Sequence, residues 1–335
     1  MNSKRLFHCA LALLALASTR ASVAQEELFV TNSNSNSVTV YSRTASGNTA
    51  PIRILAGPAT GLAGPSGILV DTVNEELVVA NLALPYSVTV YPRTASGNVA
   101  PLRTITGAGT MLDGPRGVAV DVQNNELIVA NRAGFSITVY ARTANGNAGP
   151  IRTIGGNQTG LSNPWGVVLD PYNGEFVVAN NGGSMTVYAR TAFGNLPPLR
   201  ITTGSETGFN NGPIGILFDI IYSELTVTTP FYGGEFRPAV LVFPRLTNGN
   251  STPIRSIVGA GTGLSGPNGL AWDFFNDDLY VANSLNNSVT VYAREANGNA
   301  APKRTLSGAA TLLNNPQFVA VTGAFLSVLF ASSFE

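Results

Sequence analysis

The sequence predicts an all-β protein that folds as a six-bladed β-propeller with four antiparallel strands in each blade. The first observation is a repeat of 49 to 54 residues, whose units open with Pro-x-Gly. The second is that each unit holds four short apolar runs, rich in Val, Ile, Leu and Tyr, with Gly, Pro, Asn and Asp between them. The third is that no window beyond the N-terminus shows the 3.6-residue period of a helix. Four short strands repeated around an axis make a propeller.

The opening tripeptide and the run that follows it predict the first strand of each blade. The run is apolar and ends in aspartate, as in residues 118–121. The tripeptides begin at Pro65, Pro115, Pro164, Pro213 and Pro267, with a weaker copy at Pro316, in which Phe318 replaces the glycine. Later runs such as residues 127–130 are apolar at every position, which indicates strands covered on both faces by neighbouring blades.

Three more strands are expected in each unit. The second ends in asparagine in five units, at Asn32, Asn81, Asn131, Asn180 and Asn283, and in Thr229 in the sixth. The third reads Ile-Thr-Val-Tyr at residues 137–140, with close copies elsewhere. The fourth follows Gly-Asn and Pro-x-Arg, as at Arg152. Gly, Pro and Asn between these runs are the residues that turns require.

The two ends of the repeat complement one another. Residues 28–55 supply only the second, third and fourth strands of one blade, and the missing first strand is found at residues 317–321. Pairing these segments closes the ring and removes two exposed sheet edges, which otherwise invite aggregation. Because the repetition is uninterrupted, we predict one domain over residues 25–323.

The segments outside the repeat are read separately. Residues 1–24 place Lys4 and Arg5 before an apolar stretch and small residues at its end, which predicts a secretory signal peptide, too short to span a membrane. We therefore expect an exported protein without a membrane span. Residues 324–335 form a short apolar tail of undecided role.

Composition excludes several kinds of chemistry. Removal of residues 1–24 takes away His8 and Cys9, the only histidine and cysteine, and leaves 16 basic against 19 acidic residues, a net charge of −3. Disulfides, thiolate or histidine metal sites and Ser-His-Asp catalysis are thereby excluded. Nothing favours nucleic acid or an anionic membrane as a partner.

The units resemble the blades of NHL-type propellers. Residues 115–121 (Pro-Arg-Gly-Val-Ala-Val-Asp), 129–131 (Val-Ala-Asn) and 137–140 carry this likeness, and residues 29–32 with 38–41 also resemble the YVTN repeats of surface propellers. A kelch pattern fits less well, because its Gly-Gly pair is matched only at Gly182 and Gly183. The resemblance covers residues 26–323 and implies a propeller without specifying its function.

Repeated polar residues allow a catalytic interpretation beside a structural one. The first-strand aspartates Asp71, Asp121, Asp170, Asp219 and Asp273 could ring the channel and hold a cation, or could accept backbone N–H bonds in turns, which we favour. The second-strand asparagines Asn32, Asn81, Asn131, Asn180 and Asn283 are channel candidates, or turn residues. Six-bladed lactonases of the gluconolactonase type are similar in outline and hold a divalent cation with Asn, Asp and Glu oxygens. This likeness implies the alternative function, a calcium- or magnesium-dependent lactonase or esterase.

Arginines recur on the predicted third and fourth strands, as at Arg142 and Arg152. They could form an anion-binding belt, but ion pairs with carboxylates of a neighbouring blade explain them better. Such pairs, when exposed, contribute little stability.

The loop after the second strand is where the units differ most. Aromatic side chains and arginine are the residue types that anchor interfaces. The candidate binding residues are Tyr86, Phe135, Phe231, Tyr232, Phe236 and Arg237, although the aromatics could instead cover blade edges. We therefore predict a monomeric, exported binding or scaffold module for a protein, peptide or surface glycan, with no cofactor, no resident metal and no catalytic residues.

Overall fold

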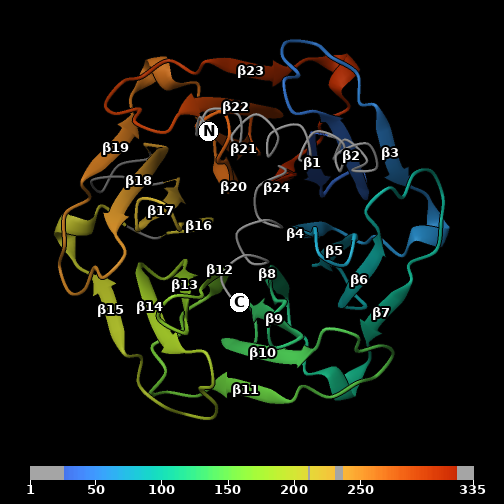
Figure 1. The fold of residues 1–335 in the computed structure, drawn as a ribbon, viewed down its shortest axis with the longest axis vertical. Coiled ribbons are helices and arrows are strands. Elements are labelled where there is room, and N and C mark those ends of the chain that lie inside the picture. The colour runs from blue at the N-terminus through green and yellow to red at the C-terminus, as the bar shows by residue number, and fades with distance from the viewer. Residues whose placement is uncertain (1–25, 210–211, 231–236, 323–335) are drawn as a thin grey trace, which may run out of the picture.

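The computed structural model describes residues 26–209, 212–230 and 237–322. It confirms the predicted fold: six four-stranded antiparallel sheets lie around a central axis (Figure 1). The predicted signal peptide and the apolar tail lie outside the described residues. Within the described ranges, no helix has the length and apolarity needed to cross a membrane.

Each blade runs from an inner strand beside the axis to an outer strand at the rim (Figure 1). Blade 1 comprises β24 (Pro316–Val321), β1 (Glu27–Asn32), β2 (Ser37–Ser42) and β3 (Arg53–Ala56). Blade 2 comprises β4 (Pro65–Asp71), β5 (Glu76–Asn81), β6 (Ser87–Pro92) and β7 (Arg103–Thr106), and blade 3 comprises β8 (Pro115–Asp121), β9 (Glu126–Asn131), β10 (Ser136–Ala141) and β11 (Arg152–Gly155). Blade 4 comprises β12 (Pro164–Asp170), β13 (Glu175–Asn180), β14 (Ser184–Ala189) and β15 (Arg200–Thr203). Blade 5 comprises β16 (Ile216–Asp219), β17 (Glu224–Thr229), β18 (Ala239–Pro244) and β19 (Arg255–Val258), and blade 6 comprises β20 (Pro267–Asp273), β21 (Asp278–Asn283), β22 (Ser288–Ala293) and β23 (Arg304–Ser307).

Short 3-10 turns lead from one blade to the next. They are η2 (Pro58–Thr60), η3 (Ala108–Thr110), η4 (Ser205–Thr207), η5 (Ala260–Thr262) and η6 (Ala309–Thr311). The tyrosine of the third strand holds the turn that precedes its own blade: the Tyr140 hydroxyl donates to the Thr110 carbonyl oxygen at 2.5 Å. Burial raises the pKa of Tyr140 to about 12, so this donor keeps its proton at neutral pH.

The core lies between blades rather than within them. Val88 and Val90 of blade 2 pack with Val118 and Leu127 of blade 3 in one cluster of buried side chains, and Tyr140 of blade 3 completes it. Strands such as β9 are therefore buried on both faces, as their continuous apolar runs predicted. Burial of apolar area on this scale is the main source of stability in such a ring.

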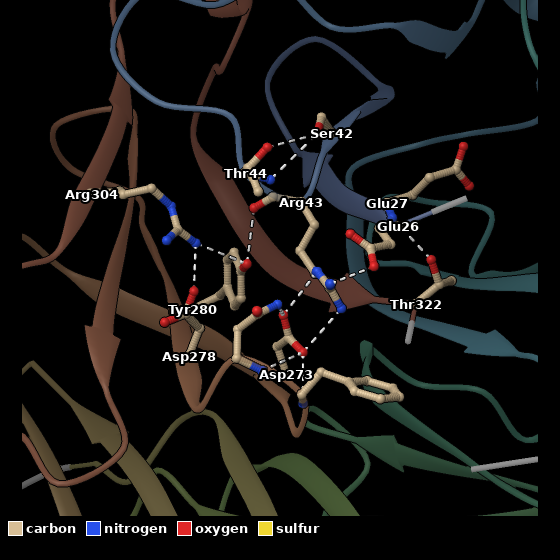
Figure 2. Close-up of polar contacts among 12 residues, drawn as sticks. Glu26, Glu27, Ser42, Arg43, Thr44, Asp273, Asp278, Tyr280, Arg304 and Thr322 are labelled. Atoms are coloured by element: carbon tan, nitrogen blue, oxygen red, sulfur yellow. Dashed lines mark hydrogen bonds and ion pairs between the residues drawn. The ribbon is translucent and has the colours of Figure 1, made fainter. Parts of the chain in front are cut away.

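The ring closes as expected. Strand β24 pairs antiparallel with β1, with Leu28 opposite Val321 and Val30 opposite Val319. Figure 2 shows a second closure between blades 6 and 1, where Arg43 lies between Asp273 and Glu26. Its Nε is 2.9 Å from Asp273 Oδ2, and its Nη2 is 2.8 Å from Glu26 Oε1. The strand pairing thus completes blade 1, and the contact between Arg43 and Asp273 joins that blade to blade 6.

The repeated arginines pair with carboxylates across blades, as expected. Glu76 on β5 receives both Nη atoms of Arg103 from its own blade, each at 2.8 Å. Arg142 of blade 3 reaches the same carboxylate at 2.7 Å. The Glu76 side chain is only 11% exposed, so this bridge is better shielded from solvent than a surface ion pair.

Candidate binding site

The two faces of the ring differ in how strictly they repeat. On one face, four residues separate the first and second strands in each of blades 2 to 6. On the other face, between three and nine residues separate the second and third strands. These loops meet the connections that enter the first strands, since the Arg132 amide donates to the Gly114 carbonyl oxygen at 3.0 Å. We call this second side the loop face.

The central channel is lined by the first strands of all six blades. It forms a cavity of about 450 Å³ whose wall is largely aliphatic and includes Leu69, Val120, Val168 and Leu217. The lining runs from Gly117 and Gly166 to the four-residue turns and includes no residue of the loops after the second strands.

Glycines lie where neighbouring inner strands come closest together. A Cβ placed on Gly117 would lie 2.4 Å from the Trp165 carbonyl oxygen, and one on Gly67 would lie 2.1 Å from the Arg116 carbonyl oxygen. Real Cβ atoms do not approach backbone atoms so closely. The glycine of Pro-x-Gly therefore allows the inner strands of blades 2 to 5 to approach the backbone of the next blade closely at this end of the channel.

The middle residue of each Pro-x-Gly, and of Pro-Gln-Phe in blade 1, directly precedes this point of close approach. The six positions hold six different side chains: Ser66, Arg116, Trp165, Ile214, Asn268 and Gln317. Four of them are in contact around Arg116: its Nη1 lies 3.5 Å from Ser66 Oγ of the adjacent blade and 3.3 Å from Gln317 Oε1 two blades away, and its guanidinium group lies over the Trp165 ring. We call these six residues the neck.

Arginine and tryptophan meet within the neck. The Arg116 guanidinium carbon lies 4.0 Å from the centre of the Trp165 ring, and the guanidinium carbon of Arg132, from the loop after β9, lies 5.0 Å from the same ring. Arg116 is 8% exposed. Burial, with the charge of Arg132 adding to it, lowers the pKa of Arg116 to about 9.

The predicted loop residues are placed as follows. Phe135 is 48% exposed on the loop after β9, where its φ is +46°. Tyr86 is half-buried, and its carbonyl oxygen accepts a bond from Thr106 Oγ1 at 3.0 Å. Arg237 is exposed beside β18. Phe231, Tyr232 and Phe236 lie outside the described residues.

The predicted channel asparagines are fully buried within the blades. Each ends a second strand, one strand away from the channel wall. The Asn131 amide nitrogen donates to Thr138 Oγ1 at 2.9 Å, and its carbonyl oxygen accepts the Asp113 amide at 3.2 Å. Asn32, Asn81, Asn180 and Asn283 make the equivalent pair of bonds. They tie the second strand to the third strand and to the entering connection.

The first-strand aspartates act in turns, the role we favoured. Asp121 Oδ1 accepts the Asn124 amide at 3.0 Å, and Oδ2 accepts the Asn124 side chain at 2.8 Å. Within the described residues, no three His, Cys, Asp or Glu side chains gather closely enough to hold a metal ion. The channel lining includes the oxygen-bearing side chains of Asp121, Gln123, Asn124 and Asp170, which lie in or next to the four-residue turns, and there the Oδ1 atoms of Asp121 and Asp170 accept turn N–H bonds.

The neck is the feature that the sequence reasoning missed. Its residues are about 50 positions apart, and only the closed ring brings them together. The available signal was a variable middle residue between an invariant proline and a nearly invariant glycine. A residue that varies between fixed neighbours is not required by the scaffold, so its side chain is a candidate for function.

Comparison with solved structures finds propellers. A chain of the nidogen/laminin complex matches with a TM-score of 0.61 and 15% identity, covering 88% of this chain and 97% of that chain. A 6-phosphogluconolactonase candidate from Bacteroides fragilis matches with a TM-score of 0.60 and 14% identity, covering 91% and 100%. Another from Bacteroides uniformis matches with a TM-score of 0.59 and 13% identity, covering 89% and 99%.

These likenesses establish the β-propeller fold and nothing finer. No family model and no curated protein matches the chain by sequence. The resemblance to NHL and YVTN repeats therefore stays a prediction.

Proposed function

We propose that this protein is an exported binding module that takes a protein, peptide or surface glycan on its loop face. The observation that carries the proposal is the contrast between the two faces. Turns of constant length repeat on one side, while loops of three to nine residues and the six different neck side chains gather on the other. Variation placed on a rigid scaffold is the usual arrangement of a recognition surface.

Two further observations support this proposal. Phe135, Leu84 and Leu285 are exposed on loops of this face, on blades 3, 2 and 6. An aromatic ring such as that of Phe135 is a residue type that anchors interfaces. Among the similar structures, one belongs to a complex between two proteins, nidogen and laminin. Export follows from the predicted signal peptide and awaits its own measurement.

A matched pair of substitutions tests the loop face. The variant F135N removes the exposed ring but keeps the left-handed backbone, which asparagine tolerates. The variant Y172N removes a still more exposed ring from a turn on the opposite face, where Tyr172 is 68% exposed. Peptide and glycan arrays would be probed with the mature chain and both variants.

We expect F135N to weaken binding to the retained ligands at least roughly tenfold, about 1.4 kcal/mol, while Y172N binds as the wild type does. A ligand whose binding falls with Y172N and not with F135N would overturn the assignment of the face. Failure of the wild type to bind any probe above background would count against a peptide or glycan partner.

The alternative is a calcium- or magnesium-dependent lactonase or esterase with a cation in the channel. Thermal unfolding of the mature chain in EDTA, then with excess calcium or magnesium, tests it directly. A tightly bound cation must raise the midpoint, because the free energy of unfolding grows as RT ln(1 + [L]/Kd). A rise with one cation alone would favour the hydrolase.

A further inference from the structure

Two arginines depart from the charge pairing that the rest of the ring follows. Leaving Arg237 aside, the arginines within the described residues lie within 4 Å of an Asp or Glu oxygen, except Arg116 and Arg132. No other unit has an arginine at either equivalent position. The neck position holds Ser, Trp, Ile, Asn or Gln, and the position of Arg132 holds Ser, Leu, Asn or Pro. The scaffold therefore does not require these two charges.

The hydrogen bonds available to the pair are weak. Arg116 Nη1 contacts two neutral oxygens at 3.3 and 3.5 Å, both at the long end of the range. The buried nitrogens Arg116 Nε, Arg132 Nε and Trp165 Nε1 have no hydrogen-bond partner among the described residues. Several rim arginines also leave Nε unbonded, but their Nη atoms hold carboxylates. Among the residues that the structure describes, no carboxylate fills that role for Arg116 or Arg132.

This arrangement is costly in the unliganded protein. A buried cation without a counter-charge loses its hydration, and a second cation against the same ring adds repulsion. The cation–π contacts with Trp165 offset only part of this cost. An anion bound beside these arginines would supply both the missing charge and acceptors for the unbonded N–H groups.

We propose that Arg116, Arg132 and Trp165 form a binding subsite for an oxyanion, a carboxylate or phosphate group that approaches from the loop face. Guanidinium groups bind both of these groups through paired N–H bonds, and the indole N–H adds a second kind of donor. The subsite deepens the proposed function, on which it rests for the source of the anion. That source is either a free small molecule or the carboxylate of a bound peptide.

The fluorescence of Trp165 can report the binding of an anion to this subsite. The chain has two tryptophans, so the variant W272F leaves Trp165 as the sole indole reporter. Succinate and phosphate would be titrated against chloride at matched ionic strength, with tryptophan fluorescence and the unfolding midpoint both recorded. Variants R116M and R132M remove one charge each. R245M is the matched control, because it removes a rim arginine that lies 3.6 Å from its carboxylate.

We expect succinate or phosphate, but not chloride, to change the fluorescence and raise the midpoint in the wild type and in R245M. Affinity should fall at least roughly tenfold in both R116M and R132M. Without anion, R116M should unfold at or above the wild-type temperature, because an uncompensated buried charge has been removed. Equal responses to chloride, or responses in R116M and R132M that match R245M, would overturn the proposal.

A second titration separates the two sources. A hexaglutamate peptide that binds more tightly than succinate, and whose advantage is lost in F135N, identifies a peptide carboxylate. Succinate binding as tight as that of the peptide identifies a free small anion. The succinate titration requires no contact with Phe135, so it tests the subsite separately from the loop face. Loss of array binding in F135N with no anion response would leave the proposed function standing without this subsite.

Discussion

Glu76 illustrates how single residues join the blades. Its hydrogen bonds from Arg103, and the charges of Arg103 and Arg142, hold the pKa of this carboxyl below its ordinary 4.5. One carboxylate therefore fastens the outer strand of blade 2 and also the third strand of blade 3. Equivalent glutamates at the start of the other second strands, such as Glu126 and Glu224, repeat this bridge.

The pH dependence of stability follows from this lowered pKa. A carboxyl whose pKa is lower in the folded state stabilises the fold above its unfolded pKa, and the contribution is lost as pH falls through the folded pKa. We expect E76Q to cost about 1.5–3 kcal/mol at neutral pH, since it removes bonds to a charged group. The difference from wild type should shrink as pH falls below the ordinary value of 4.5.

Urea unfolding across this pH range measures the effect. The control is E295Q, because Glu295 is 80% exposed and its pair with Arg294 faces solvent. It should change the free energy of unfolding by less than about 0.5 kcal/mol at any pH. An E76Q penalty that stays constant down to about pH 3 would show that packing rather than charge is responsible.

The inner strands carry the geometry of the neck. In blades 2 to 5, the inner strand can approach its neighbour only because Pro-x-Gly places a glycine where a Cβ would clash with the backbone of the next blade. Blade 1 breaks this rule with Phe318, and Gly269 of blade 6 accommodates it, since a Cβ there would lie 2.4 Å from Phe318 Cγ. The spacing of the inner strands is thus set by glycine against backbone in blades 2 to 5, and by the contact of Gly269 with Phe318 at the closure.

Substitution at one of these glycines should open the neck. In G117A the new methyl group meets the Trp165 carbonyl oxygen, so the inner strands must shift, and we expect a loss of about 1–3 kcal/mol. G149A is the control, because its nearest atom would lie 3.6 Å away, an ordinary contact. Urea unfolding midpoints that coincide for the two variants would show that the close approach is not limiting.

The strands could be predicted from the sequence, whereas the neck could not. Alternating turn residues and apolar runs fix β9 and its neighbours locally, because strand formation and turns depend on nearby residues. The role of the Asn131 side chain depends on residues outside its own strand. Its amide nitrogen donates to Thr138 Oγ1, and its carbonyl oxygen accepts the Asp113 backbone amide, across loops whose direction the sequence does not give. Arg116 and Trp165 meet only through ring closure, which no local pattern encodes.

At the scale of the whole molecule, closure makes the centre of the ring unique. Near-identical blades produce equivalent interfaces around the axis, but the neck combines one residue from each blade and repeats nowhere. Gln317 reaches the neck on β24, the strand that also completes blade 1. The same strand therefore closes the fold and also supplies Gln317, whose Oε1 contacts Arg116 of the candidate anion subsite.

Removal of β24 tests this double role. A chain of residues 26–322 keeps the pairing of β1 with β24, including the bond from the Glu27 amide to Thr322 Oγ1 at 3.0 Å. A chain of residues 26–315 loses that strand and exposes the edge of β1, a template for association with other chains. We expect the longer chain to be monomeric by light scattering and to unfold in one cooperative transition. The shorter chain should aggregate or unfold without cooperativity, and should lose any fluorescence response to succinate. If it instead remained monomeric with an unchanged midpoint, the remaining strands would suffice for the ring, and β24 would be an addition to the fold rather than its closure.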